Sequence, residues 1–316
     1  MASQYLVTNT LGGYLTAPKL SKQLYAATVP LMRFRQFVSF KEAWGKGKGE
    51  TVLFDRYTNI DTAGTTVDET ATIPRNKIIF SQGTLTLTEY GNAVGKTLKL
   101  ETLAEFNVDD PLHRALRNDM AATLDSAIAT QFKATLARYV CLTSTSGTLT
   151  TNGTFGGTAT SALNLYHIKQ LRDQLRKWNV EPFPDGNYVC IASVTALRGI
   201  RDDTSTGAWI DANRYAGSKR LFSGEVGELM GVRFIEVTNG LSSSGYGEAV
   251  IFGQDTVMEA VALPEEIRVD TPSDFGRFMA VAWYTIAGWK IIWCGTGESV
   301  NSSLGVVPHI IYVGSL

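Results

Sequence analysis

One stretch of the sequence carries residue types that could bind a nucleotide. Residues 88–97 read Thr-Glu-Tyr-Gly-Asn-Ala-Val-Gly-Lys-Thr and follow an alternating, strand-like run. A phosphate-binding loop needs Gly, four residues and then Gly-Lys-Ser/Thr, because that length lets successive backbone N–H groups surround the phosphates. Here only three residues separate Gly91 from Gly95, and the one apolar run that ends in aspartate, 52–55, lies upstream. We therefore predict a structural turn, and retain a nucleoside triphosphatase using Lys96 and Thr97 as the enzyme alternative.

The remaining residues with catalytic or metal-binding chemistry are scattered along the chain. The three histidines, at 113, 167 and 309, have no second ligand three or four residues away, as a metal site on a helix would need. The three cysteines, at 141, 190 and 294, form no Cys-x-x-Cys motif and are interpreted as small buried apolar residues. The glycines of residues 224–231 lack the spacing of a dinucleotide site. We expect no enzyme activity, no cofactor and no metal.

Composition indicates an ordinary globular protein with one unusual segment. The chain has 316 residues, of which 44% are hydrophobic and 19% charged, so it can bury a large core. The apolar runs are shorter than the ~20 residues of a membrane helix, and we expect no membrane partner. Residues 1–48 contain seven basic residues against one glutamate. Such an arm can contact nucleic acid or an acidic surface, with a solvated arm as the simpler alternative; its candidate residues are Lys19, Lys22, Arg33, Arg35 and Lys41.

The first hundred residues predict excursions with little core of their own. After an extended arm at 1–30, apolar spacing predicts a short helix within 31–44. Strands predicted at 51–57, 77–80 and 84–88 make a long hairpin with a polar tip. Glycines permit unusual backbone angles, so we predict flexible hinges on both sides of this hairpin. The candidate hinge and inter-subunit residues are Gly45, Lys46, Gly47, Lys48, Gly49, Gly91, Gly95 and Lys96, with Lys96 facing a neighbouring subunit or solvent.

A long amphipathic helix is the clearest predicted element. Apolar residues recur every fourth position, at Leu112, Leu116, Met120, Leu124, Ile128, Phe132 and Leu136. Asp109 and Asp110 supply an N-cap and first-turn negative charge. About thirty residues would give a rod of roughly 45 Å, which we call the spine helix.

The second half alternates helices and strands before a β-rich end. After a linker at 142–160, we predict a helix capped by Ser161, a strand at 188–192 and a short helix at 193–200. Strands are predicted at 232–237, 249–252, 257–262 and 267–270, followed by two strands at 278–286 and 290–294 broken at Ala287-Gly288. The whole chain is therefore α+β, with an α/β unit at 161–255. Its arm and hairpin need surfaces on other copies to bury them, which favours self-assembly.

In this order the segments resemble the major capsid proteins of tailed bacteriophages. The residues that carry the resemblance are Arg33-Phe-Arg-Gln-Phe37, Gly45-Lys-Gly-Lys-Gly-Glu-Thr-Val52, Leu85-Thr-Leu-Thr-Glu-Tyr-Gly-Asn92, Ala115-Leu-Arg-Asn-Asp-Met-Ala121, Gly224-Glu-Val-Gly-Glu-Leu-Met-Gly-Val232 and Phe275-Gly-Arg277. Each motif alone is loose, and their order is what makes the resemblance.

The resemblance implies a specific architecture and function. It implies an N-terminal arm (1–49), an extended loop (50–100), a peripheral domain with the spine helix (101–160), an axial domain (161–255) and a return to the peripheral domain (256–316). Proteins of that family form pentamers and hexamers of an icosahedral shell in the virion, assembled in the host cytoplasm. Their partners are scaffolding protein, portal, in some cases decoration protein, and DNA enclosed without sequence specificity. The same shell fold leaves an encapsulin-like compartment open as an alternative.

Overall fold

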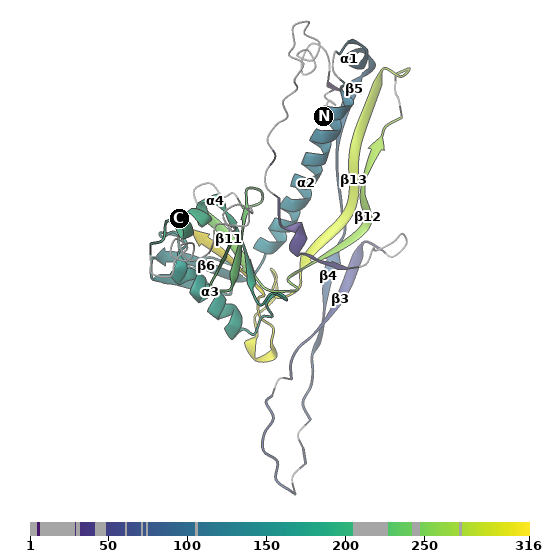
Figure 1. The fold of residues 1–316 in the computed structure, drawn as a ribbon. Coiled ribbons are helices and arrows are strands. Elements are labelled where there is room, and N and C mark those ends of the chain that lie inside the picture. Colours follow the sequence, from purple (N-terminus) through teal and green to yellow (C-terminus); the bar gives the residue numbers. More distant parts are fainter. Residues whose placement is uncertain are drawn as a thin grey trace.

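The computed structural model places two sheets, a long helix and a projecting hairpin along one chain. It describes residues 5–6, 29, 32–41, 49–60, 62–70, 72–73, 75–104, 107–204, 227–241, 247–271 and 274–316. The long helix α2 (Asp109–Lys133) runs beside strands β5 (Thr88–Thr97), β12 (Val257–Val269) and β13 (Phe278–Ile291) (Figure 1). The hairpin of β3 (Thr51–Tyr57) and β4 (Phe80–Thr86) projects beyond them, and the other sheet lies to one side. The α+β class predicted from the sequence is confirmed.

The spine helix is α2, Asp109–Lys133, whose 25 residues give a rod of roughly 37 Å. The four-residue stripe is confirmed in part, since five of its members are buried within the helix: Leu112, Leu116, Leu124, Ile128 and Phe132. The predicted cap is wrong: Val108 holds the cap position without a side-chain bond, and the Asn107 side chain accepts the Asp109 N–H at 3.1 Å. The helix is also shorter than predicted, because it ends at Lys133, Leu136 lies in the connection that follows and Tyr139 belongs to β6, Ala137–Thr143.

The five-stranded sheet supports the spine helix. Its order is β1-β5-β13-β12-β2, with bounds Tyr5–Leu6, Thr88–Thr97, Phe278–Ile291, Val257–Val269 and Ser39–Lys41. Leu112 and Leu116 of α2 pack on Val281 and Trp283 of β13 in a small buried cluster. The register between β12 and β13 shifts twice between Val261 and Glu266, which accommodates Pro264 without a ladder hydrogen bond.

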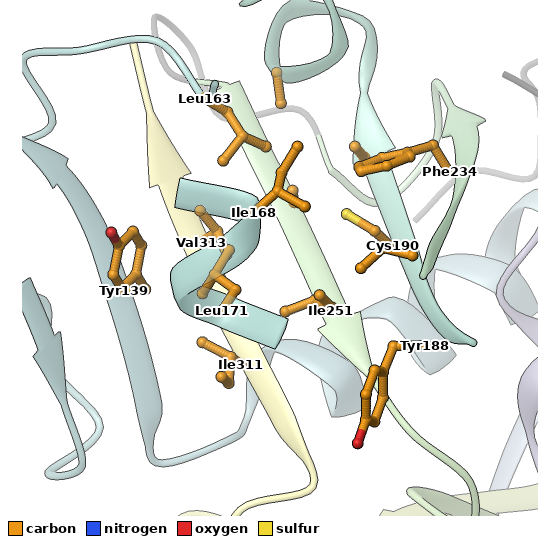
Figure 2. Close-up of a cluster of buried hydrophobic side chains, with 14 of the residues drawn as sticks. Tyr139, Leu163, Ile168, Leu171, Tyr188, Cys190, Phe234, Ile251, Ile311 and Val313 are labelled. Atoms are coloured by element: carbon orange, nitrogen blue, oxygen red, sulfur yellow. The ribbon is translucent and has the colours of Figure 1, made fainter. Parts of the chain in front are cut away.

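The seven-stranded sheet carries most of the core. Its order is β7-β6-β14-β11-β8-β10-β9, with bounds Ser146–Thr150, Ala137–Thr143, Ile310–Ser315, Gly247–Phe252, Tyr188–Ser193, Val232–Val237 and Gly227–Leu229. Helices α3, Leu165–Lys177, and α4, Val194–Asp202, contribute side chains to the cluster on one face, and Figure 2 shows Ile168 and Leu171 of α3 close to Ile251, Ile311 and Val313. On the opposite face Leu124, Ile128 and Phe132 of α2 pack with alternate side chains of the same central strands. Both faces of β8 and β11 are therefore buried, as all six residues of each strand are.

The remaining elements complete the description. The hairpin strands are β3, Thr51–Tyr57, and β4, Phe80–Thr86, and a short helix α1, Leu98–Leu103, follows β5. Two 3₁₀ turns lie at η2, Arg35–Phe37, and η4, Ser302–Leu304. The helix predicted within 31–44 is reduced to η2, and the chain then enters β2, where three residues pair with β12.

Several predicted boundaries in the second half are corrected. The helix capped by Ser161 begins instead at Leu165, where the Asn164 side chain accepts the His167 N–H at 3.2 Å. Strand β13 continues through Ala287-Gly288 without the predicted break. The predicted linker contains the end of β6 and all of β7, and β14 was not predicted. Strands from three of the proposed segments thus share the seven-stranded sheet, and the five-part division itself stays a proposal.

Candidate assembly surface

The root of the hairpin is fixed to the body of the molecule by an apolar cluster. Val52 and Phe54 of β3 and Leu85 of β4 are buried together with Met258 and Ala260 of β12. Alternation places these side chains on one face, so the opposite face of the same strands is exposed. The backbone of β4 approaches β13 closely at this point. A Cβ on Gly288 would lie 2.5 Å from the Thr86 carbonyl oxygen.

Arg56 adds a polar clamp at the end of the root. Its guanidinium pairs with Glu298 at 2.8 Å and donates to the Ile292 carbonyl, while its side chain is only 10% exposed. The same guanidinium lies 5.5 Å from the Trp293 ring centroid. Buried, multiply bonded arginine holds a fixed orientation, so the angle at which the hairpin leaves the body is set here.

Beyond the root the hairpin exposes apolar side chains that nothing in the described chain covers. Tyr57 and Phe80 form the last strand pair, and their side chains are 70% and 74% exposed with ring centroids 6.4 Å apart. Further exposed apolar residues on the projection are Leu53, Ile60, Val67, Ile73, Ile78 and Ile79. The described residues between Tyr57 and Phe80 contain no helix or strand, and the segment extends far from both sheets (Figure 1). A projecting apolar strip of this kind is typical of a protein interaction surface.

The stretch that resembled a phosphate-binding loop is an ordinary strand. Residues 88–97 are β5, which pairs with β13 without interruption from Thr88↔Ala287 to Thr97↔Phe278. The predicted turn is therefore wrong. An extended, paired backbone cannot wrap its N–H groups around a phosphate, so the geometry that a nucleoside triphosphatase would need is missing at this stretch.

Lys96, Gly91 and Gly95 lie in β5, and their structural partners are on other elements. The Lys96 side chain is buried, with its Nζ 2.6 Å from Asp109 and 3.2 Å from Glu101, so it does not face solvent in the subunit, and its role between subunits stays a prediction. Burial alone would lower its pKa, but the hydrogen bonds to both carboxylates outweigh burial and the pKa is raised. A Cβ on Gly91 would lie 2.9 Å from the Trp283 carbonyl oxygen. The hinge role of Gly91 and Gly95 stays a prediction.

The root of the basic arm is held by acidic groups of the same chain. Arg35 pairs with Glu259 at 3.0 Å and with Glu265. Phe34 is fully buried, and its backbone N–H donates to Asp125 of α2 at 2.9 Å. Arg33 is exposed, and the backbone of Lys41 lies in β2. Gly49 has a left-handed backbone with φ of 85°, whereas Lys19, Lys22 and residues 45–48 lie outside the described residues.

In the described part of the chain, the residues with possible catalytic chemistry are not brought together. His167 is fully buried and its Nδ1 contacts the Tyr139 hydroxyl at 2.9 Å. Burial raises the pKa of each cysteine thiol, Cys141, Cys190 and Cys294, to about 12, which removes their reactivity near neutral pH. Within the described ranges, histidine, cysteine and carboxylate side chains form no cluster able to hold a metal ion. None of the helices in that same part of the chain has the length and apolar composition that a bilayer crossing requires.

Comparison with known proteins relates this architecture to solved assemblies. No protein-family model matches the chain, and no curated protein matches it. Among solved structures, the Cyanophage Pam1 capsid asymmetric unit matches with a TM-score of 0.71 at 16% identity, covering 100% of this chain and 99% of that chain. The capsid of Helicobacter pylori bacteriophage KHP30 matches with a TM-score of 0.67 at 11% identity, covering 100% of this chain and 99% of that chain. The capsid of Ralstonia phage GP4 matches with a TM-score of 0.64 at 14% identity, covering 99% of this chain and 98% of that chain.

The chain has the phage capsid fold. The capsid fold covers both sheets, the spine helix and the hairpin, because these matches span nearly the full length of each chain. At 11–17% identity the likeness to these capsid structures lies in the arrangement of the elements. The order of the segments along the chain was the signal in the sequence that pointed to this fold.

Proposed function

We propose that this chain is the major capsid protein of a tailed bacteriophage. Copies of it assemble as pentamers and hexamers into an icosahedral shell that encloses the phage DNA without reading its sequence. Its role is structural rather than enzymatic, in the virion capsid, after assembly in the host cytoplasm.

The observation that carries this proposal is the end-to-end match to capsid structures, over 100% of this chain and 99% of the Cyanophage Pam1 chain. The exposed apolar strip of the hairpin adds a physical reason for assembly. Its side chains gain burial only when another copy covers them, and each apolar Å² removed from water contributes about 25 cal/mol. Many such contacts repeated over a closed shell add to a stable particle.

Further partners follow from the same proposal. Scaffolding protein, a portal and, in some shells, a decoration protein are the partners that a capsid of this kind uses. The basic arm at 1–48 supplies positive charge for a contact with DNA, which would be salt-dependent and independent of sequence. In the described part of the arm, Arg33 is exposed for such a contact, whereas Arg35 is engaged by Glu259 and Glu265.

The test is electron microscopy of the expressed chain, alone and together with the products of neighbouring genes. We expect closed shells or capsomers. A protein that stays monomeric under both conditions would contradict the proposal, and particles that contain an enzyme cargo and no DNA-packaging machinery would favour the compartment alternative.

A matched pair of variants connects this test to the hairpin. Tyr57→Ser/Phe80→Ser removes the two most exposed aromatic side chains of β3 and β4, and we expect it to fold but assemble poorly. Tyr57→Leu/Phe80→Leu keeps apolar side chains at both positions and should assemble. Circular dichroism melting of both isolated subunits serves as the control for folding.

A further inference from the structure

The turn between β12 and β13 presents an aromatic side chain in a strained conformation. Asp274, Phe275 and Gly276 have φ angles of 49°, 55° and 84°, so three successive residues are left-handed. This conformation suits glycine and is unfavourable for a bulky aromatic residue. The Phe275 side chain is also fully exposed, at 105% of its reference area. A strained residue that the described part of the chain leaves uncovered points to a contact outside the subunit.

An apolar groove lies beside this turn. It has a volume of about 620 Å³ and lies between α1 and the first residues of β13. Its lining residues are Thr97, Leu98, Lys99, Thr102, Leu103, Arg277 and Phe278. Leu98 and Leu103 are 44% and 57% exposed, so its apolar wall is open to solvent. The volume falls in the range of pockets that enclose whole ligands, which leaves ample room for one aromatic side chain.

The charges around the turn and the groove are complementary. Lys99 and Arg277 give the groove a positive rim, while Asp270 and Asp274 give the turn negative charge. Within one chain Arg277 pairs with Asp274 at 3.1 Å, but the two side chains are 71% and 42% exposed, so this pair contributes little stability and can exchange partners. Opposite charges of this kind orient one surface on another.

We propose that the Phe275 turn of one copy inserts into the α1–β13 groove of the next copy. The proposal rests on the proposed function, since it names a contact by which subunits assemble. The Phe275 turn and the α1–β13 groove lie at the same end of the molecule, where α1 and the start of β13 meet (Figure 1). A contact between two different surfaces at one end repeats by rotation and closes a ring around an axis near that end.

The test uses introduced cysteines in assembled particles. The native cysteines are buried and have raised thiol pKa values, so they do not compete. Particles co-assembled from Phe275→Cys and Leu103→Cys chains are oxidised with glutathione disulfide and separated on a non-reducing gel. We expect disulfide-linked dimers in the mixed particles and none in particles of either single variant. In the double variant Phe275→Cys/Leu103→Cys, the largest covalent ring gives the order of the axis.

Other results overturn the proposal in distinguishable ways. Well-formed particles without the mixed dimer, dimers from Phe275→Cys alone, or a double variant linked only within single chains would each exclude the contact while leaving the shell function intact. Failure of the unmodified parent chain to form any particle would instead remove the proposed function and this inference with it.

A second pair of variants tests the contact by its energy. Phe275→Asp should raise the protein concentration needed for assembly about tenfold or more, as expected for loss of an interface anchor. Phe275→Tyr should assemble like the parent chain. Melting temperatures of the isolated subunits should not fall in either variant, because the side chain has no contacts to lose. Normal assembly of Phe275→Asp would refute the contact.

Discussion

At the scale of single residues, Asp125 shows how the spine helix and the arm are joined. Its carboxylate is buried on α2, where Oδ1 accepts the Phe34 N–H at 2.9 Å and Oδ2 faces the Asn239 amide at 3.4 Å. Burial raises its pKa, and hydrogen bonds from the backbone of Phe34, Arg35 and Arg33 and from Asn239 oppose that rise. The root of the arm is thus attached to the spine by hydrogen bonds to one acidic group.

Replacing this carboxylate should loosen the arm root. Asp125→Ala leaves the buried Phe34 N–H without its acceptor, which costs about 1–3 kcal/mol. We expect a lower melting temperature and faster proteolysis between residues 29 and 41. Asp125→Asn keeps an acceptor of similar shape and should lose less. Equal losses in the two variants would show that the hydrogen bond to Phe34 does not matter.

His167 should make the subunit sensitive to acid. Burial lowers its pKa, and a backbone hydrogen bond with Thr143 partly offsets this. The unfolded chain therefore takes up a proton near pH 6.5, at a pH where the folded chain does not, and stability falls as the pH drops below that value. Burial lowers the pKa of His309 in the same way.

Melting temperatures between pH 7.5 and 5.5 measure this effect. The parent subunit should lose stability towards pH 5.5. His167→Gln should show a flatter profile, and His167→Gln/His309→Gln the flattest. Parallel profiles in all three proteins would mean that other groups control the acid response.

At the scale of elements, the hairpin is held by a close approach between two backbones. β13 passes β4 where Gly288 leaves space for the Thr86 carbonyl and the Leu85 side chain. This explains why a glycine stands within a long strand, a position where it otherwise weakens β structure.

Gly288→Ala should push the hairpin away from the sheet. Its Cβ would meet the Thr86 oxygen at 2.5 Å, and because that atom belongs to the backbone the whole strand must move. We expect destabilisation of about 1–3 kcal/mol, the usual cost of overpacking, measured by denaturant unfolding. Gly64→Ala, which has nothing within 4 Å, is the matched control and should be neutral. A neutral Gly288→Ala would mean that the contact at the root relaxes freely.

The same glycines explain where sequence reasoning succeeded and failed at this scale. Buried strands such as β8 and β10, and the apolar stripe of α2, were predicted because their side chains carry the pattern. β5 was mistaken for a turn and β13 was broken in two, because Gly91 and Gly288 resemble turn residues in isolation. Each of these glycines is needed because a backbone carbonyl from a distant segment leaves no room for a Cβ, and a local sequence pattern does not record such a contact.

Some features of the candidate surfaces could be predicted from the sequence and others could not. The hairpin could be predicted from its lack of core residues, since composition is a local property. The partners of Lys96 could not, because Asp109 comes close only when α2 folds back along β5. The exposed state of Phe275 likewise depends on its backbone angles, which its residue type disfavours.

At the scale of the whole molecule, α2 packs against both sheets. Its first half packs on β13, and its second half packs in a cluster that contains side chains of the seven-stranded sheet and of β12 and β13. The hairpin has a small cluster at its root, and its described residues beyond the root belong to no buried cluster. Rigidity should therefore fall from the two sheets towards the hairpin end in an isolated subunit, and only assembly can restore it there.

Hydrogen exchange compared between isolated subunits and assembled particles tests this distribution. Residues 62–70 lie in a region of the projection without helix or strand, so their amides should exchange almost as fast as in an unfolded peptide when the subunit is alone. In particles a neighbouring copy covers the exposed apolar strip, and the same amides should slow by orders of magnitude. The amides of β8, a fully buried strand, are the internal reference and should be protected in both states. Equal protection of residues 62–70 in the two states would mean that the hairpin holds its conformation without neighbours, and its apolar side chains would then need another explanation than assembly.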